Sequence, residues 1–240
     1  MGNFAKEVNE IIFDGRLIGL TKKDSRIRPI TAGYILRRLA AKCANRHVIE
    51  RRSADLQPIQ LGMEVPGVAE AAIHAMHRCI EAMLSDYVTI NLDFTNAFNT
   101  VRRDLILDNV AANTPEIYRF TFTIYTCEPQ LAYEPYLIRF KEGSQQSNAL
   151  SSLEFCDATQ STLKSLKSEL RSSFIIDITL SGYISTVASD IEKIVAAATE
   201  TDLQLNPTEC KIFYQNIDTI SHYKIFYQFK RINCKDMMLL

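Results

Sequence analysis

Residues 86–94 read DYVTINLDF, and residues 95–101 continue as TNAFNTV. Apolar side chains occupy alternate positions of the first stretch, which is typical of a β-strand with one buried face. Helical spacing begins directly afterwards, so Asp93 lies where a strand ends and a helix begins. One interpretation is that Asp93 caps the helix that starts at Thr95. The other is that the strand end presents its carboxylate to a divalent cation such as Mg²⁺.

The rest of the sequence alternates between expected strands and helices without an internal repeat. Strands are expected at 15–21, at the end of KKDSRIRPIT, at 86–94, on both sides of Pro135, in SFIIDITL (173–180), and after LQLNPTEC. Helices are expected at 33–47, 68–84, 95–113, from Thr114 onward with Pro115 at its first position, at about 149–170, and at 189–202. This order indicates an α+β or mixed α/β fold rather than a doubly wound sheet.

The charge of the chain is unevenly distributed. The 240 residues carry a net charge of −1, but residues 1–52 hold twelve Lys or Arg and five Asp or Glu, which is +7. The remaining 188 residues therefore carry −8. Two explanations are open: a solvated basic surface, or a surface that attracts phosphate groups. On the expected helix at 33–47, Arg37, Arg38 and Lys42 are predicted to face solvent.

The sequence contains no apolar run of the length of a signal peptide or a membrane span. Its six cysteines form no C-x-x-C pair, which favours reduced thiols. We therefore expect an intracellular protein, in the nucleus or the cytoplasm, without a membrane partner.

Taken in order, the motifs resemble the reverse transcriptase domain of retroelements, especially the non-LTR kind, over roughly residues 15 to 215. The matching stretches are LTKKDSRIRPIT (20–31), ILRRLAAKCANR (35–46), INLDFTNAFNTVRRD (90–104), KEGSQQSNALSSLEF (141–155), FIIDIT (174–179) and LQLNPTECK (203–211). They resemble, respectively, the first fingers segment, the helix after it, the first palm motif, the Gly-x-x-Gln-Gly-Asp-Pro-Leu motif, the Phe/Tyr-x-Asp-Asp motif, and Leu-x-Leu-Asn-Pro-x-Lys-Cys.

The resemblance implies an α+β polymerase of the right-hand type, a single domain over 1–240 with fingers and a palm. The palm would contain an antiparallel sheet backed by helices, and the thumb would be missing. It places the fingers at 15–86, the palm at 87–215 with part of the fingers inserted at about 112–142, and a remnant tail at 216–240. The implied activity is synthesis of DNA from dNTPs on an RNA template and a DNA primer.

The resemblance also implies a role for seven residues of this sequence. In the family, carboxylates hold two Mg²⁺ ions that clamp the attacking hydroxyl and the leaving pyrophosphate. Asp93 and Asp177 would be these metal ligands and catalytic residues. Arg28, with Lys22 or Lys23, would bind the triphosphate. Phe98 would press under the sugar, and Gln146 would line the nucleotide pocket.

The sequence departs from the family pattern at the reaction centre. Ile176 stands where the first aspartate of the pair belongs, and Ile178 replaces the following glycine. Ile-Asp-Ile favours an extended strand, so the hairpin turn is expected to be lost. Ser147, Asn148 and Ala149 replace Gly-Asp-Pro, and Glu209 stands at the position of a lysine that is often assigned to protonating pyrophosphate.

Loss of one carboxylate from a two-metal site should slow the reaction by ~10³-fold or more. The sequence therefore predicts weak Mg²⁺ binding and little or no polymerase activity. Two alternatives stay open. The same scaffold could be a non-catalytic module that binds RNA or a protein through residues 16–52, or the chain could be an unrelated α/β interaction domain.

Overall fold

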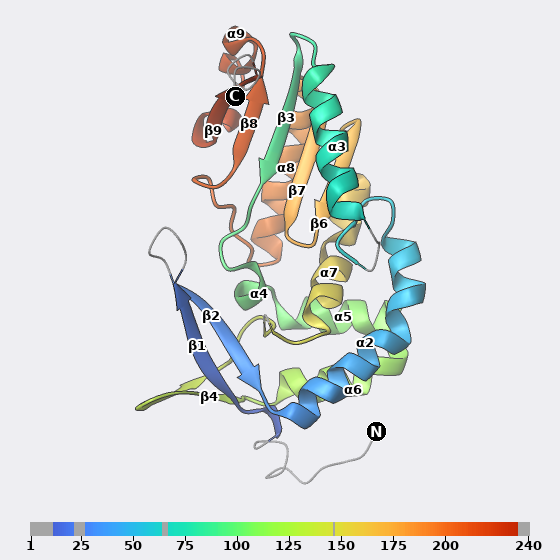
Figure 1. Cartoon of the computed structure of the whole chain (residues 1–240), viewed down its shortest axis with the longest axis vertical. Helices are drawn as coiled ribbons and strands as arrows, with labels where there is room; N and C mark the ends of the chain where they lie inside the picture. The colour runs from blue at the N-terminus through green and yellow to red at the C-terminus, as the bar shows by residue number, and fades with distance from the viewer. Residues whose placement is uncertain (1–11, 22–26, 64–66, 146, 235–240) are drawn as a thin grey trace. The chain divides into compact units, whose positions relative to one another are not determined.

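The structure is a computed structural model that describes residues 12–21, 27–63, 67–145 and 147–234 (Figure 1). The chain divides into two compact units, and each is described by itself. The first unit contains residues 1–52 and 98–158, and the second unit contains residues 53–97 and 159–240.

The first unit contains a four-stranded sheet in the order β2-β1-β4-β5. Its strands are β1 (Gly15–Thr21), β2 (Ile27–Gly33), β4 (Gln130–Tyr133) and β5 (Tyr136–Arg139). The helices with residues in this unit are α2 (Ile35–Leu56), α4 (Ala97–Thr100), α5 (Arg103–Asn113), α6 (Pro115–Thr126) and α7 (Ser151–Ser165). β1 and β2 pair antiparallel, and β1 pairs parallel with β4. The strands expected at 15–21 and around Pro135 are confirmed.

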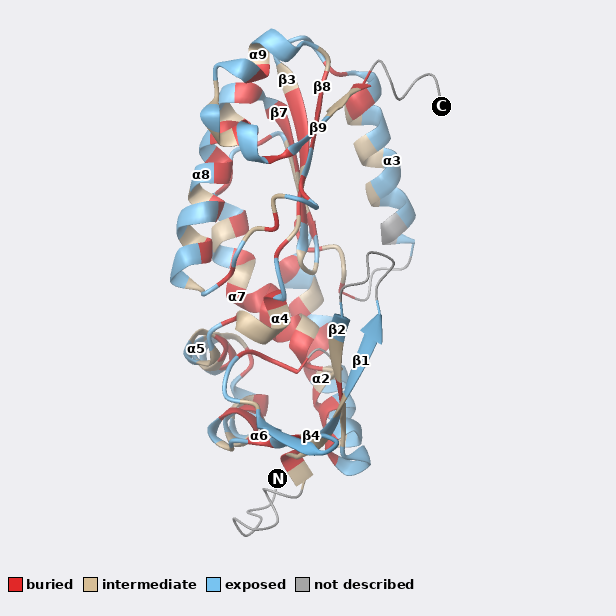
Figure 2. Ribbon diagram, turned by 90° about the vertical axis from the view of Figure 1, so that its left-hand side faces the viewer, coloured by how far each residue is buried: buried red, intermediate tan, exposed pale blue. Residues whose placement is uncertain are grey.

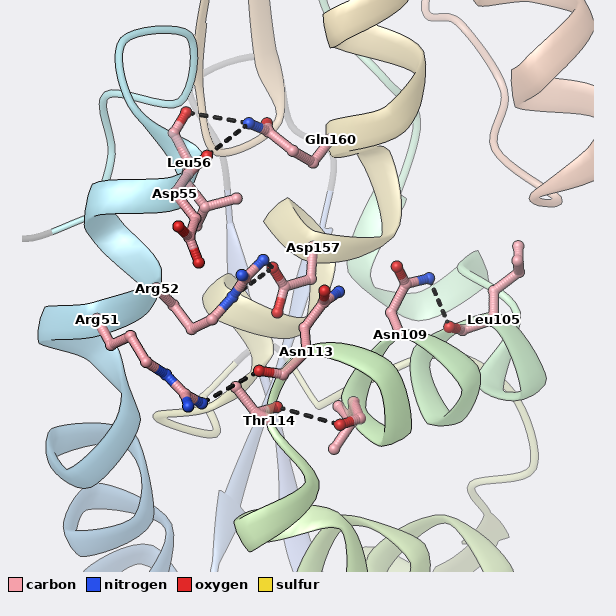
Figure 3. Close-up of polar contacts among 11 residues, drawn as sticks. Arg51, Arg52, Asp55, Leu56, Leu105, Asn109, Asn113, Thr114, Asp157 and Gln160 are labelled. Atoms are coloured by element: carbon pink, nitrogen blue, oxygen red, sulfur yellow. Dashed lines mark hydrogen bonds and ion pairs between the residues drawn. The ribbon is translucent and has the colours of Figure 1, made fainter.

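Helix α2 extends nine residues beyond the end expected at His47. Its buried stripe continues through Val48, Ile49, Arg52 and Leu56. Arg52 is a charged residue, but its Nη2 lies 2.5 Å from Asp157 Oδ1 of α7 (Figure 3). Asp157 is far from Arg52 in the sequence. The apolar pattern of the sequence alone therefore predicts a helix that ends at His47, too early.

The prediction that Arg37 faces solvent was wrong. Arg37 is 3% exposed, and its Nη1 donates a hydrogen bond of 2.8 Å to the Phe13 carbonyl. Gly33 makes room for it, because a Cβ there would lie only 1.7 Å from Arg37 Nη2. Burial lowers the pKa of Arg37 to about 10. Arg38 and Lys42 are exposed, as expected.

The helix expected at 95–113 is two helices, α4 and α5. Arg102 has an extended backbone between them, with φ −62° and ψ 128°. The next helix, α6, begins at Pro115 after Thr114, as expected, but the Thr114 side chain makes no capping hydrogen bond. Its hydroxyl instead lies 3.5 Å from the Val110 carbonyl (Figure 3).

The second unit contains a five-stranded sheet in the order β6-β7-β3-β8-β9. Its strands are β3 (Tyr87–Leu92), β6 (Leu170–Phe174), β7 (Asp177–Tyr183), β8 (Lys211–Tyr214) and β9 (Lys230–Asn233). Its other elements are α3 (Val68–Glu81), α8 (Ile184–Glu200), α9 (Ile217–Ser221) and the 3₁₀ helix η1 (Lys224–Gln228). β3 pairs antiparallel with both β7 and β8. Figure 2 shows α3 and α8 on opposite faces of the sheet.

Both faces of β3 are covered, and this changes the expected alternation. Ile90 and Leu92 are fully buried, as the period of two predicts. Thr89, on the other face, is fully buried as well, and its hydroxyl lies 2.7 Å from that of Ser181 on β7. β9 joins the same sheet parallel to β8, although its stretch of sequence shows no clear period.

Helix α7 ends earlier than expected, at Ser165 instead of about Leu170. The Asp190 carboxylate of α8 accepts hydrogen bonds of 2.7 Å from the backbone N–H groups of Lys167 and Ser168 and from the Ser168 hydroxyl. These N–H groups are therefore occupied outside the helix. The residues that follow are free to enter β6.

The prediction that SFIIDITL forms one strand without a turn was wrong. β6 and β7 form a hairpin in which Phe174 pairs with Asp177, and Ile175 and Ile176 are its two loop residues. Ile175 has φ +60°, a conformation that a β-branched residue rarely adopts. Its carbonyl accepts hydrogen bonds from Ser173 Oγ at 3.1 Å and Gln60 Nε2 at 3.4 Å. Tertiary contacts therefore hold a turn that local preference disfavours.

The six cysteines all lie in the described part of the chain, and no disulfide joins them. This agrees with the reduced thiols that their spacing predicts. In the same described ranges, no helix combines the length and the apolar character needed to cross a bilayer.

Candidate functional site

Asp93 directly follows β3 and is half-buried. Its carboxylate Oδ2 accepts a hydrogen bond of 3.1 Å from Asn206 Nδ2, and its carbonyl accepts one of 2.8 Å from the Asn206 backbone N–H. Thr95 N–H in turn donates to the Gln204 carbonyl at 2.8 Å. The asparagine of LQLNPTECK therefore fixes both the backbone and the side chain of Asp93.

Asp177 is the first residue of β7, and its side chain is exposed. It follows the two loop residues of the β6–β7 hairpin directly. In contrast to Asp93, its position depends on the hairpin turn. The Ile175 side chain of that turn lies close to Gly62, because a Cβ at Gly62 would lie only 2.5 Å from Ile175 Cγ1.

The register of the sheet brings the two aspartates to neighbouring strand ends. Leu92 of β3 pairs with Ile178 of β7, so the next step of the same antiparallel register sets Asp93 beside Asp177. Partial burial raises the pKa of Asp177, and the negative charge of Asp93 raises it further. Two carboxylates that repel each other at a strand end are a candidate cation site, because a bound cation would relieve the repulsion.

The donor set suits one divalent cation better than two. Mg²⁺ is commonly held by one or two carboxylates together with phosphate oxygens and water. Asp93 and Asp177 can supply that much, while Ile176 offers no ligand in the hairpin loop. Among the residues that the structure describes, no group of three or more His, Cys, Asp or Glu side chains is arranged to hold a metal ion.

Two further predicted site residues lie in the first unit. Arg28 is exposed on β2, where it pairs with Leu20 of β1. Phe98 lies in α4, and its ring packs on Phe155 with centroids 5.5 Å apart. The carbonyl of Phe98 accepts a hydrogen bond of 2.6 Å from the Ser144 N–H. Phe98 is thus tied to the segment that precedes Gln146.

Lys22, Lys23 and Gln146 lie outside the described residues. Their predicted contacts with a nucleotide stay predictions. The neighbouring Ser147 is described, and its hydroxyl donates a hydrogen bond to the Thr31 carbonyl of β2.

Sequence reasoning missed Arg103, which organises the segment before Gln146. Its Nε donates to the Gly143 carbonyl at 3.0 Å, and its Nη2 donates to the Phe140 carbonyl at 2.9 Å. The guanidinium also lies over the rings of Tyr125 and Phe140, at 5.4 and 5.0 Å from their centroids. Gly143 has φ +66°, and a Cβ at this position would lie only 2.2 Å from the backbone carbonyl carbon of Asn99. The only signal in the sequence is a charged residue inside an expected helix, which does not indicate this role.

No protein-family model and no curated protein matches the sequence. Solved structures of similar fold include telomerases. The telomerase from Candida albicans in complex with a TWJ fragment of telomeric RNA has a TM-score of 0.65 and 9% identity, over 89% of this chain and 43% of that one. The apo telomerase from Candida tropicalis has a TM-score of 0.63 and 9% identity, over 88% of this chain and 46% of that one. A form of it truncated from the C-terminal domain gives 0.61 and 10%, over 83% and 49%.

This chain therefore has a reverse-transcriptase-like fold of the α+β class with two sheets. The fold expected from the order of the motifs is confirmed at this level. A sequence identity of 9–10% supports a similar fold and no more than that. The chain spans less than half the length of the telomerases that it matches.

Proposed function

We propose that the chain is a reverse-transcriptase-like domain of a non-LTR retroelement whose polymerase chemistry is impaired. The observation that carries the proposal is the pairing of β3 with β7, which sets Asp93 beside Asp177 and leaves Ile176 in the hairpin loop. Within this proposal, the fingers comprise residues 15–86 and the palm comprises residues 87–215, with a fingers insertion at about 112–142.

In the proposed reaction, Asp93 and Asp177 would hold Mg²⁺ against the phosphates of the incoming nucleotide. When bound, this ion supplies charge stabilisation to the transferring phosphoryl group. Asn206 holds the Asp93 carboxylate in place, so this half of the site is preorganised. Because Ile176 supplies no carboxylate, the charge of a second metal ion has no counter-charge. We therefore expect the polymerase reaction to be slowed by ~10³-fold or more.

The nucleotide contacts remain those that the family resemblance implies. Arg28, with Lys22 or Lys23, would bind the triphosphate, and Gln146 would line the pocket. Phe98 would press under the sugar, and its bond to Ser144 and its packing on Phe155 support a fixed position for this ring.

Primer extension on an RNA template, with Mg²⁺ or Mn²⁺, tests this proposal directly. We expect no extension by the unmodified chain above the level of its Asp93→Asn variant. The variant Ile176→Asp restores a carboxylate to the loop, and we expect it to bind Mn²⁺ at least tenfold more tightly by calorimetry. Extension that requires Asp93 in the unmodified chain would contradict the impairment. An unchanged Mn²⁺ affinity in Ile176→Asp would contradict the location of the site.

A non-catalytic role in binding nucleic acid is favoured by one further observation. Arg38, Lys42 and Arg46 lie on α2 at intervals of four residues, and all three are exposed. Cations at this spacing form a stripe along one helix face, which suits a phosphate backbone. Two of the similar telomerase structures contain telomeric RNA, which supports RNA as the partner.

Filter binding of RNA across a salt series tests this second role. We expect the triple variant with glutamine at 38, 42 and 46 to lose most of the affinity and to flatten the salt dependence. The matched control neutralises Lys164, Lys224 and Lys230, three exposed lysines outside α2. Equal losses in the two triple variants would show that net charge alone matters and would contradict a role for α2.

A further inference from the structure

Strand β5 is the outer strand of the sheet in the first unit, whose order is β2-β1-β4-β5. All four of its residues, Tyr136–Arg139, are exposed. β4 pairs with one side of β5, and among the residues that the structure describes no strand pairs with the other side. An open strand edge presents main-chain N–H and C=O groups that can pair with another chain.

The register of the β4–β5 hairpin shows which main-chain groups of β5 are open. Phe140 N–H donates to the Pro129 carbonyl at 2.9 Å, so the hydrogen bonds of Phe140 are directed toward the β4 side. This direction alternates along an antiparallel strand, which turns the groups of Ile138 toward β4 and those of Leu137 and Arg139 away from it. The N–H and C=O groups of Leu137 and Arg139 therefore point to the open edge.

The side chains of β5 do not protect this edge. Natural sheets commonly protect an edge strand with lysine, proline or a bulge. β5 pairs with β4 in a continuous register and carries three large apolar side chains, of which Tyr136 is 65% exposed and Leu137 is 69% exposed. Its one charged residue, Arg139, already lies 3.5 Å from Glu128 of the same chain. The edge is therefore both open and apolar.

Two other sheet edges are contacted from within the chain. At β2, the Ser147 hydroxyl donates a hydrogen bond to the Thr31 carbonyl. At β6, Ser173 N–H donates to the Ile59 carbonyl at 2.8 Å, and Leu61 N–H donates to the Ser173 carbonyl at 2.7 Å. Within the described ranges, β5 has no comparable neighbour on its outer side.

A second copy of β5 would complete the hydrogen bonds of this edge. In an antiparallel pair centred on Leu137, the two Leu137 residues exchange both main-chain hydrogen bonds. In the same register, the Arg139 N–H of each copy meets the Pro135 carbonyl of the other. The proline at 135 has no N–H, so it leaves no donor without a partner.

The side chains that meet in this register are complementary. Leu137 lies opposite Leu137 of the other copy on one face of the sheet, and Tyr136 lies opposite Ile138 on the other face. Arg139 of each copy comes close to the hairpin loop that holds the exposed Glu134 of the other. Apolar groups therefore meet apolar groups, and opposite charges are neighbours.

Other two-fold registers are less favourable. A pair centred on Arg139 brings two guanidinium groups together, and a pair centred on Ile138 sets the apolar Leu137 opposite Arg139. A pair centred on Pro135 lacks both central N–H donors. The sequence of β5 therefore selects the register that is centred on Leu137.

We propose that the chain forms a weak two-fold dimer in which the β5 strands of two copies pair antiparallel and join their four-stranded sheets. The same edge is used in both copies, so the contact is closed and does not extend into fibres. Only a short strand of each copy takes part, so the buried area lies below the roughly 1,200 Å² of stable interfaces, and the dimer depends on concentration. The contact does not involve Asp93 or Asp177, so its test is separate from that of the proposed function.

Sedimentation equilibrium of the full chain tests the dimer. Reducing conditions prevent the exposed Cys43 from linking two chains. We expect the average mass to rise from that of one chain toward that of two between about 5 and 500 μM. A mass that stays at one chain up to about 500 μM would overturn the proposal and leave the edge to a different partner. Growth beyond two chains would overturn the two-fold symmetry.

A pair of lysine substitutions locates the contact. Leu137→Lys places a charge at the centre of the paired strands, and we expect it to weaken the dimer at least tenfold. The control is Leu39→Lys on α2, which makes the same change at another exposed leucine of the first unit and should leave the dimer unchanged. Equal effects of the two substitutions would show that general surface apolarity, and not β5, drives association.

A second pair of substitutions separates backbone pairing from side-chain contact. Valine and proline have similar side-chain sizes, but proline has no N–H, and the Leu137 N–H points away from β4. Leu137→Pro therefore keeps the β4–β5 hydrogen bonds, and we expect it to dimerise at least tenfold more weakly than Leu137→Val. Equal dimerisation by these two variants would contradict strand pairing. If Leu137→Pro does not fold, as judged by circular dichroism, the two lysine variants still decide the location.

Discussion

Asp177 and Asp190 lie in the same unit, and their electrostatic environments are opposite. Burial alone would raise the pKa of Asp190, but hydrogen bonds from Lys193, Ser168 and Lys167 outweigh burial and hold the pKa below its ordinary value. Partial burial raises the pKa of Asp177, and Asp93 raises it further. The fold therefore provides hydrogen-bond donors and a positive charge for Asp190, whereas Asp177 faces another negative charge.

The difference separates a structural carboxylate from a candidate functional one. Asp190 ends α7 and joins it to α8, so its ionised form stabilises the folded chain. Asp177 makes the folded chain slightly less favourable when it is ionised, and that repulsion persists only because the hairpin holds the residue in place. Groups left in an unfavourable charge state are where a ligand can gain binding energy.

Removal of Asp190 should have the largest effect on stability. Asp190→Ala leaves the buried Ser168 N–H, the partly buried Lys167 N–H and the Ser168 hydroxyl without their acceptor, and we expect a loss of about 4 kcal/mol in the free energy of unfolding. Urea denaturation measures it. The control, Lys193→Met, removes only the partly exposed ion pair of 2.9 Å and should cost less than about 1 kcal/mol. Similar losses in both variants would contradict the role of the N–H groups.

Glu154 extends the comparison to a buried carboxylate of the first unit. Desolvation, with a further contribution from Asp157, raises its pKa to about 7, although the hydrogen bond from Tyr125 opposes this shift. Between its ordinary pKa of 4.5 and about 7, the folded chain keeps a proton that the unfolded chain has released. Stability should therefore fall as pH rises through this window, by about 3 kcal/mol in total, and stay low above it.

Glu154→Gln removes this titration. We expect the variant to be more stable than the unmodified chain by about 3 kcal/mol at pH 8 and nearly equal to it at pH 4. Urea denaturation at several pH values provides the measurement. If the unmodified chain and the variant lose stability in parallel between pH 4 and 8, another group is responsible.

The sequence predicts the fold well where local pattern and tertiary structure agree. The alternation in DYVTINLDF predicts β3, and the order of the motifs predicts a reverse-transcriptase-like fold. The sequence misleads where a partner far away in the chain allows a charged residue to be buried. Arg52 belongs to the buried stripe of α2 because Asp157, 105 positions away, neutralises it. Arg37 is buried because Gly33 leaves space for its side chain and the Phe13 carbonyl accepts a hydrogen bond from its guanidinium.

The candidate site shows the same limit. Asp93 and Asp177 can be found from the motifs, and the sheet register brings them together. The turn at Ile175 and Ile176 cannot be found from local preference, because β-branched residues favour extended strands. It is imposed by Gln60, Ser173 and the space at Gly62, and two of these lie more than a hundred residues earlier in the chain.

The two loop residues of the hairpin offer a matched pair of substitutions. Ile175 has φ +60°, which costs a β-branched residue about 1–2 kcal/mol, whereas Ile176 has no positive φ. Glycine relieves the strain at the first position and only adds flexibility at the second. We expect Ile175→Gly to be more stable than Ile176→Gly by about 1 kcal/mol in urea denaturation. The reverse order would show that packing of the Ile175 side chain, rather than backbone strain, governs this turn.

The smallest effect concerns Asp177 itself. Because the charge of Asp93 contributes to the raised pKa of Asp177, Asp93→Asn should lower that pKa, and a carboxyl carbon NMR titration would follow it. The folded chain binds this proton more tightly than the unfolded chain, so stability declines slightly as pH rises through the pKa of Asp177. Asp93→Asn should reduce that decline, but by only a few tenths of a kcal/mol because solvent screens the exposed Asp177. Asp218→Asn, a change on α9, is the control and should leave the titration of Asp177 unchanged. If Asp93→Asn also leaves it unchanged, the two carboxylates do not interact, and burial alone accounts for the raised pKa of Asp177.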